Sequence, residues 1–366
     1  MIIQPFKSAI PKLSHLFSQE LFFESVKEQF PLYQKNGFYI KEKEAAFFIY
    51  DCQNDKRHFT GLIAGTSTAD YQNGHIVKHE NTLVIKEQKQ ERLARERQAL
   101  IKPVLLTYPN SGHIEALQQD YITQFEQYYE LSYKNAIHRF WKVTDPIWVS
   151  KFQEAFSKIP KAYIGDGHHR ASTIAKIYQK TKNPFYNNLF SIYLPFESIK
   201  ISNWNRVIAG LNGYSKLGLM AKLANFFQIT PIETPYQPVI ANELVMILGK
   251  QWFKMTWRKA ILKKYKSLPV ETQFDISIFN KEIAQGILGI GDIRTDTRII
   301  PVEGDRSFPG LQKALRNANQ ESVGFVFSSL DLTDIINVAK KGSVMPPKST
   351  FVIPRMINGM LAYPLA

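Results

Sequence analysis

One octet, residues 163–170, carries the side chains of this chain that are best suited to chemistry. It reads Tyr-Ile-Gly-Asp-Gly-His-His-Arg, with a short apolar run before it and a helix-compatible stretch, residues 171–178, after it. A strand, a glycine turn and a helix start point backbone N–H groups and the positive end of the helix dipole at an anion. The pattern therefore predicts a phosphate or carboxylate site at this turn.

The residue types in the turn define what it could do. The two glycines let the backbone approach a ligand or adopt a positive φ, and the arginine offers a planar fork for phosphate or carboxylate oxygens. The acid and the two histidines can transfer protons, ligate a metal or orient their neighbours. Adjacent histidines at a helix start without any chemistry are the alternative. The candidate residues are Gly165, Asp166, Gly167, His168, His169 and Arg170.

Glu80 is a second acid of interest, because it follows His79 at the point where a charged helix is expected to begin. This pair could take part in proton transfer. In the alternative interpretation Asn81 or Thr82 caps the helix, and Glu80 is only an exposed acid at its end.

Residues 342–350 end in Lys-Ser-Thr, as a phosphate loop does. A Walker loop needs backbone N–H groups to surround the phosphates, and Pro346 and Pro347 supply none. The rigid Pro-Pro pair could still present Lys348 and Ser349 to a bound anion. An ordered turn without a ligand is the alternative.

The Asp-Gly-His-His-Arg motif resembles the signature of a widespread family of uncharacterised bacterial and archaeal proteins of similar length. In this motif the family is similar to the ParB/sulfiredoxin-like superfamily, which includes ADP- or ATP-dependent free-serine kinases. Further segments resemble family motifs in the same order, from about residue 55 to the C-terminus. They are residues 79–82, 102–108, 140–143, 205–208 and 345–350. An Asn-Pro-x-Ser-Phe-Leu-His stretch, usual near the N-terminus of the family, is missing.

The resemblance implies a mixed α/β fold, with a ParB/sulfiredoxin-like catalytic core and a C-terminal α+β elaboration. It implies Glu80 as the general base, because an acid N-terminal to the motif takes the hydroxyl proton in the kinases. The donor would be ATP, ADP or pyrophosphate, with Mg²⁺ bridging its phosphates through Asp166. His168 or His169 would stabilise charge on the transferred group. The expected phosphate-binding residues are Gly165, Gly167, Arg170, Arg206, Lys348 and Ser349.

The composition is that of a globular protein. The chain has 366 residues, of which 44% are hydrophobic and 13% aromatic, enough for a packed core. No apolar run approaches the ~18 residues of a membrane span, and the start does not resemble a signal peptide. The single cysteine, Cys52, cannot form an internal disulfide. These features favour a cytoplasmic protein without a membrane partner.

The net charge of +14 suits anionic ligands, including nucleic acid. Residues 86–97 mix basic and acidic side chains, as a solvated helix does. Residues 252–266 interleave basic residues with Trp252, Trp257 and Tyr265. Aromatic residues in such an arrangement could stack on single-stranded nucleic acid. A β-hairpin with one buried face would show the same pattern, and we favour it.

The hydrophobic patterns predict alternating strands and helices. Strands are expected in residues 38–71 as a meander, and at 104–108, 136–143, 162–164, 189–195 and 323–328, with a hairpin at 243–248 and 251–258. Helices are expected at 80–100, 114–129, 146–157, 170–181, 217–227, 274–288 and 332–341. A Gly-rich stretch at 210–218 suggests a boundary. We therefore expect a catalytic portion at 1–212 and an α+β portion at 213–366.

The sequence thus predicts a phosphotransferase that acts on a small hydroxyl-bearing metabolite, with free L-serine as the first substrate to test. Its partner would be a small phosphorylated ligand. The alternative is a nucleotide- or nucleic-acid-binding regulatory protein of ParB-like type without catalysis.

Overall fold

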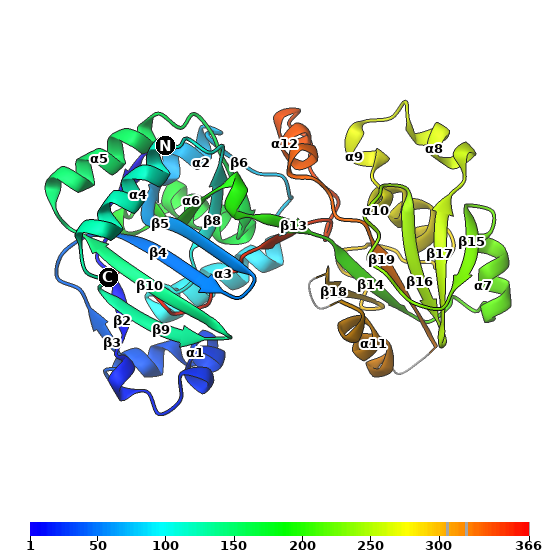
Figure 1. Cartoon of the computed structure of the whole chain (residues 1–366), viewed down its shortest axis with the longest axis horizontal. Helices are drawn as coiled ribbons and strands as arrows, with labels where there is room; N and C mark the ends of the chain where they lie inside the picture. The colour runs from blue at the N-terminus through cyan, green and yellow to red at the C-terminus, as the bar shows by residue number, and fades with distance from the viewer. Residues whose placement is uncertain (305–306, 319–320, 366) are drawn as a thin grey trace. The chain divides into compact units, whose positions relative to one another are not determined.

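The structure is a computed structural model that describes residues 1–304, 307–318 and 321–365, and these form two compact units (Figure 1). The first unit contains Met1–Lys200 and the C-terminal residues from Pro354 onward, and the second contains Ile201–Ile353. The division falls earlier than the boundary expected after residue 212, and the C-terminal segment returns to the first unit.

A mixed sheet is the centre of the first unit. Its strands are β1 (Ile3–Gln4), β4 (Phe47–Asn54), β5 (Arg57–Ser67), β6 (Ile76–Val77), β8 (Val104–Tyr108), β9 (Tyr129–Tyr133), β10 (Ala136–Val143), β11 (Ala162–Asp166) and β12 (Asn188–Pro195). Within the described residues their order is β6-β11-β8-β12-β5-β4-β10-β9, with β1 pairing on β5. β11 runs parallel to β6 and antiparallel to β8, and β8 runs parallel to β12. Two small pairs accompany the sheet: β2 (Ala9–Pro11) with β3 (Tyr39–Lys41), and β7 (Ala99–Leu100) with β21 (Tyr363–Pro364).

Helices cover both faces of this sheet. They are α1 (Gln19–Lys35), α2 (Thr68–Gln72), α3 (Val84–Arg97), α4 (His113–Gln124), α5 (Pro146–Ser157) and α6 (His168–Thr181). Phe156 of α5 packs against Tyr193 of β12 with ring centroids 4.8 Å apart. Phe190 lies three positions earlier in that strand, and alternation along a strand turns its side chain to the opposite face, where it lines a pocket with residues of α3 and α6.

The second unit has its own antiparallel sheet and core. Its strands are β13 (Lys200–Ser202), β14 (Trp204–Ala209), β15 (Phe227–Ile232), β16 (Glu243–Leu248), β17 (Gln251–Trp257), β18 (Ile299–Glu303), β19 (Ser322–Phe327) and β20 (Phe351–Ile353). The main sheet has the order β15-β17-β16-β19-β14-β18, and β13 pairs with β20. Its helices are α7 (Lys216–Leu223), α8 (Lys259–Tyr265), α9 (Val270–Gln273), α10 (Asp275–Ile278), a π-helical segment (Phe279–Gln285), α11 (Ser307–Asn317) and α12 (Leu332–Lys340).

The mixed α/β class expected from the sequence is confirmed, and the boundaries of several elements differ for physical reasons. The helix expected from residue 80 begins only at Val84 and ends before Gln98, whose φ of 51° is left-handed. The helix expected to reach residue 129 ends at Gln124, because the aromatic residues that follow form β9 and pair with β10. The helix expected at 274–288 is divided into α10 and the π-helical segment.

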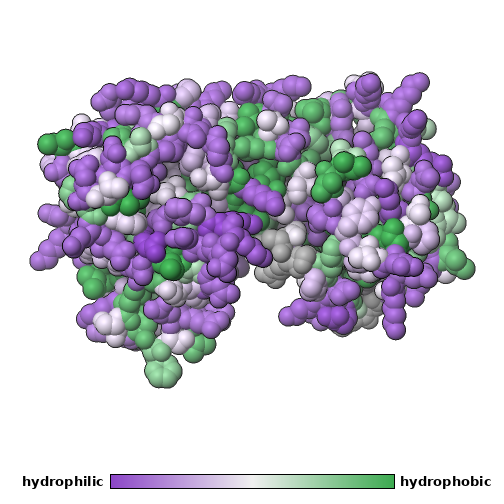
Figure 2. All heavy atoms as spheres, in the orientation of Figure 1, coloured by the Kyte–Doolittle hydropathy of each residue, from purple (hydrophilic) through white to green (hydrophobic). Residues whose placement is uncertain are grey.

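Most of the visible surface is hydrophilic, with scattered apolar side chains between the polar ones (Figure 2). Cys52 is buried in the first unit and has a free thiol. Among the helices formed by residues 1–304, 307–318 and 321–365, none combines the length and the apolar character needed to cross a membrane.

Candidate functional site

The turn between β11 and α6 holds the Asp-Gly-His-His-Arg motif. β11 ends at Asp166, and α6 begins at His168. Gly167 is the N-cap and adopts a φ of 104°, a conformation that favours glycine. The first helical hydrogen bond runs from the N–H of Ala171 to the carbonyl oxygen of Gly167 at 3.0 Å, so the N–H groups before Ala171 project from the helix start. A glycine cap brings no side chain to cover them, and the backbone anion site at this turn stays a prediction.

Asp166 lies among positive charges beside this helix start. Its Oδ2 is 2.8 Å from Nη2 of Arg170 and 3.3 Å from Nζ of Lys102. Burial opposes the ionisation of Asp166, but the charges of Arg170, Lys102 and Arg355 outweigh burial and hold the pKa of this carboxyl well below its usual range. Burial also lowers the pKa of Lys102, and Asp166 opposes that shift. The carboxylate of Asp166 is thus ionised at neutral pH and surrounded by cations.

The guanidinium of Arg170 is held over Gly167. Its Nη2 donates to Asp166 and, at 3.2 Å, to the carbonyl oxygen of Pro103. A Cβ on Gly167 would lie 2.6 Å from that Nη2, closer than atoms can pack. The absence of a side chain at Gly167 therefore lets Arg170 lie flat against the turn and point its charge toward the helix start.

Asp166 does not suit a divalent cation in this arrangement. Two cationic side chains already lie within 3.3 Å of its carboxylate, and they would repel Mg²⁺. Among the residues that the structure describes, no group of three or more His, Cys, Asp and Glu side chains could hold a metal ion. We therefore assign Asp166 to the positioning of Arg170 and Lys102 and derive no step through a metal.

Two buried histidines and Glu80 form the other side of the turn. The rings of His79 and His168 meet edge to face with centroids 4.5 Å apart. The backbone N–H of His79 donates to Nε2 of His168 at 3.5 Å, and Nδ1 of His168 lies 3.9 Å from Oε2 of Glu80. Because Nε2 accepts, the proton of a neutral His168 is on Nδ1, facing Glu80. The side chain of Glu80 is 36% exposed, so a ligand can reach it.

Burial keeps both histidines uncharged. Burial lowers the pKa of His79 to about 4. It also lowers the pKa of His168 well below its ordinary value, and the nearby His79 adds to this shift. At neutral pH His168 can therefore act as a hydrogen-bond donor but not as a cation. His169, the next residue of α6, is half-buried.

Glu87 was not recognised from the sequence, although it joins α3 to α6 beside the site. Its Oε1 accepts from Thr82 at 2.6 Å and from Ser172 at 2.5 Å, and its Oε2 accepts from Lys176 at 2.7 Å. Burial opposes ionisation, but these hydrogen bonds and the charge of Lys176 lower the pKa of Glu87 to about 2. Glu87 appeared in the sequence as one of several acids in a charged helix, and no spacing set it apart.

Three of the expected phosphate-binding residues belong to the second unit. Arg206 is fully buried, donates to Asn280 and, at 3.1 Å, to the carbonyl oxygen of Pro347. Ser349 is buried and donates to the carbonyl oxygen of Pro346, and Nζ of Lys348 lies 4.2 Å from the ring centroid of Trp204.

These contacts are internal to the second unit. A fully buried guanidinium is not accessible to a ligand phosphate, so Arg206 supports the packing of β14 against the segment that follows α12. The residues that the structure brings together around α6 are therefore Glu80, Asp166, His168 and Arg170, with Gly165, Gly167 and His169 in the same turn.

The basic and aromatic stretch of the second unit begins in the expected hairpin, β16 with β17, and continues into α8. Trp252, Trp257 and Tyr265 are buried, so none of the three presents a face on which a base could stack. Nζ of Lys254 lies 2.6 Å from Glu243 of the neighbouring strand. The aromatic residues of the pattern that suggested nucleic-acid binding are thus accounted for by packing within this unit.

Comparisons with known proteins give one family and several distant structures. The family model described as "Protein of unknown function (DUF1015)" matches residues 14–277. No curated protein matches the chain. Among solved structures, SbnI with a C-terminal truncation from Staphylococcus aureus is similar, with 11% identity, a TM-score of 0.42 and coverage of 81% of this chain and 85% of that chain.

Two further solved structures resemble the chain at a comparable level. A mutant free serine kinase in complex with ADP has 12% identity, a TM-score of 0.39 and coverage of 81% of this chain and 92% of that chain. A conserved hypothetical protein from Pyrococcus furiosus has 13% identity, a TM-score of 0.39 and coverage of 81% of this chain and 94% of that chain. The expected membership of an uncharacterised family is confirmed. The relation to the ParB/sulfiredoxin-like superfamily stays a prediction.

Proposed function

We propose that this chain, which belongs to the DUF1015 family of proteins of unknown function, transfers a phosphoryl group to a small hydroxyl-bearing metabolite. Free L-serine is the first acceptor to test, because the Asp-Gly-His-His-Arg motif resembles that of the free-serine kinases. The donor is a phosphorylated small molecule, with ATP, ADP and pyrophosphate as candidates. The observation that carries the proposal is the start of α6, which has cations on one side and an acid–histidine pair on the other.

The donor's phosphates would bind at the N–H groups that project from the start of α6. A helix N-terminus favours negative charge, and Arg170 and Lys102 add positive charge beside it. Arg170 would share its guanidinium between Asp166 and a phosphate oxygen, since its donors outnumber the acceptors that it contacts. This arrangement stabilises the charge on a transferring phosphoryl group through positioned dipoles and cations.

Glu80 would serve as the base. Its carboxylate accepts the proton of the acceptor hydroxyl while that oxygen bonds to the terminal phosphorus and the bond from phosphorus to the donor breaks. The Nδ1–H of His168 faces the same carboxylate, 3.9 Å from its Oε2.

The test is transfer with purified protein. ATP, ADP and pyrophosphate are each incubated with L-serine and Mg²⁺, and ³¹P NMR follows the formation of phosphoserine. We expect Glu80→Gln to lower turnover by about 10²–10⁴-fold while donor binding, measured by calorimetry, is retained. Arg170→Ala should weaken donor binding by roughly tenfold or more.

Lys259→Ala is the matched control, because it removes one positive charge from an exposed position on α8 in the second unit. It should change neither turnover nor binding. Donor binding without transfer to any hydroxyl acceptor would favour the regulatory alternative over catalysis. Wild-type turnover in Glu80→Gln would remove Glu80 from the role of base.

A further inference from the structure

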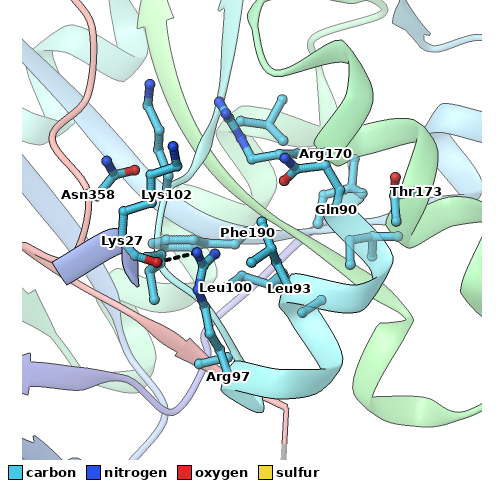
Figure 3. A pocket seen from close by; sticks show the side chains of 16 residues that line it. Lys27, Gln90, Leu93, Arg97, Leu100, Lys102, Arg170, Thr173, Phe190 and Asn358 are labelled. Carbon is cyan, nitrogen blue, oxygen red and sulfur yellow. Dashed lines mark hydrogen bonds between the residues drawn. The ribbon is translucent and has the colours of Figure 1, made fainter. Parts of the chain in front are cut away.

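A pocket with cationic walls lies between α3, α6 and the sheet of the first unit (Figure 3). Its volume is about 100 Å³. Lys27, Lys102 and Asn358 stand on one side, and Arg170, Gln90 and Thr173 stand on the other, with the ring of Phe190 between them. Arg97 completes the wall and donates to the backbone carbonyl of Lys27. Among the described residues that line this pocket, which we call the cationic pocket, none is acidic.

Positive charge exceeds negative charge around the cationic pocket. The cations are Lys27, Arg97, Lys102 and Arg170, with Arg355 close enough to act on Lys102. The neighbouring acids are Asp166, which pairs with Lys102 and Arg170, and Glu28 and Glu96, which act on Arg97. Nζ of Lys27 lies 3.7 Å from Glu28, outside the pocket lining.

This excess is costly without a ligand. Burial lowers the pKa of both Arg97 and Lys102, which shows that the pocket withdraws their charges from water. Bringing like charges together in a partly buried space is unfavourable unless an anion compensates them. The lining holds the four cations Lys27, Arg97, Lys102 and Arg170 and no acid, so an anionic ligand would be stabilised in the pocket.

The inner wall of the cationic pocket is apolar. Phe190 and Leu189 of β12 form part of it with Val104 of β8, and Leu93 and Ile174 contribute from α3 and α6. Such a wall gains from covering an apolar group, at about 25 cal/mol per Å² of apolar surface removed from water. The pocket therefore suits a ligand with two parts, one anionic and one apolar.

The cationic pocket and the histidines face opposite sides of α6. Each helical residue turns by about 100°, so Arg170, Thr173 and Ile174 lie roughly 140–240° around the axis from His168. His168 faces His79 and Glu80, while those three residues line the pocket. The part of a ligand that contacts Arg97 and Phe190 thus lies away from the proposed base, whereas Arg170 and Lys102 also serve the proposed donor site.

We infer that the cationic pocket is a binding site for a small organic phosphate, in which a phosphate dianion joins an apolar group. The cations hold the phosphate, with the guanidinium groups of Arg97 and Arg170 as the donors best matched to its oxygens. The apolar group rests on Phe190. The cationic pocket shares Arg170 and Lys102 with the proposed donor site, so the inference rests on the proposed function and concerns the part of the ligand that extends toward Lys27, Arg97 and Phe190.

Calorimetry with phenyl phosphate tests the inference, since this probe combines a dianion with one apolar ring. We expect phenyl phosphate to bind at least about tenfold more tightly than inorganic phosphate, which lacks the ring, and than phenol, which lacks the charge. AMP serves as a second phosphate ester, and tighter binding of AMP than of phenyl phosphate would identify a nucleotide as the natural class. Inorganic phosphate that binds as well as both esters would overturn the role of the apolar wall.

Substitutions of residues that line the cationic pocket test whether phenyl phosphate binds there. Arg97→Ala should weaken the binding of phenyl phosphate by roughly tenfold or more. Lys27→Ala should weaken this binding less, because the side chain of Lys27 is half exposed. Lys89→Ala, an equal charge change at an exposed position of α3, should leave binding unchanged. Thermal melts establish that each variant is folded. Glu80→Gln should also keep full affinity, which separates this site from the proposed base. Equal affinity in Arg97→Ala, Lys27→Ala and wild type would overturn the assignment.

Discussion

Glu80 and His168 meet across the first turn of α6, with Oε2 of the acid 3.9 Å from Nδ1 of the imidazole. Glu80 comes from the segment before α3, and His168 begins α6. The backbone N–H of His79 fixes the other ring nitrogen of His168, at 3.5 Å. The main-chain amide of His79 thus sets the orientation of the ring that faces the proposed base.

His79 should make the protein less stable in mild acid. Its pKa is about 4 in the folded state because it is buried, against an ordinary value near 6.5. Between these values the unfolded chain binds a proton that the folded chain excludes, so stability falls as pH drops from about 6.5 toward 4. The part of the free energy of unfolding that is lost through His79 should reach about 3 kcal/mol near pH 4.

Urea unfolding from pH 7.5 to pH 4 measures this effect. His79→Gln should show a shallower fall in the free energy of unfolding than wild type does, because the neutral amide cannot be protonated. His15→Gln, at an exposed position of the first unit, should retain the wild-type pH dependence. Identical slopes in wild type and His79→Gln would show that His79 is protonated in the folded protein.

Glu87 should stabilise the protein in a lower pH window. Its folded pKa is about 2 against an ordinary value of 4.5, so its contribution is complete above pH 4.5 and is lost as pH falls toward 2. Glu87→Gln should lower the free energy of unfolding by about 2–3 kcal/mol at pH 7, because Ser172, Thr82 and Lys176 lose a charged acceptor. The same variant should differ less from wild type at pH 3.

The matched control is Glu91→Gln on the same helix. Glu91 pairs with Arg95 at 2.8 Å on the exposed side of α3, and such pairs contribute about 0.3–0.5 kcal/mol. Chemical denaturation should therefore detect Glu87→Gln easily and Glu91→Gln barely. If the two variants cost the same at pH 7, Glu87 is not the residue that joins α3 to α6.

Local patterns predicted the elements that hold the site. The apolar run before Gly165, the glycine at 167 and the amphipathic stretch after it specify β11, the turn and α6 without reference to the rest of the chain. The α5 boundaries, Pro146–Ser157, also follow from local signals, because Asp145 caps the helix and a proline stands in its first turn.

Tertiary contacts determine the features that the sequence did not reveal. Lys102 precedes β8 and Asp166 ends β11, and these two strands pair only in the folded sheet, so the contact could not be read from the spacing of the two residues. Arg97 and Lys27 line one pocket because α1 and α3 pack side by side. Arg206 shows the reverse problem, because the motif that it resembles gave no sign that its side chain would be fully buried. Burial of a charge is decided by the partners that the fold supplies, here Asn280 and Pro347.

The two N-cap glycines of the first unit allow backbone strain to be separated from a steric clash. Gly167 caps α6 with a φ of 104°, and Gly112 caps α4 with a φ of 66°. A Cβ at Gly112 would meet nothing within 4 Å, whereas a Cβ at Gly167 would lie 2.6 Å from Nη2 of Arg170. Gly112→Ala should therefore cost about 1 kcal/mol for its positive φ alone.

Gly167→Ala should cost more, about 2–4 kcal/mol, because it adds displacement of Arg170 from Asp166 to the same kind of backbone strain. It should also weaken the binding of phosphate ligands by at least about tenfold, because Arg170 would no longer lie against the helix start. Chemical denaturation and calorimetry with pyrophosphate measure the two effects, and Gly112→Ala should bind like wild type. A Gly167→Ala protein that binds pyrophosphate as tightly as Gly112→Ala would show that the placement of Arg170 over this glycine has no part in holding the anion.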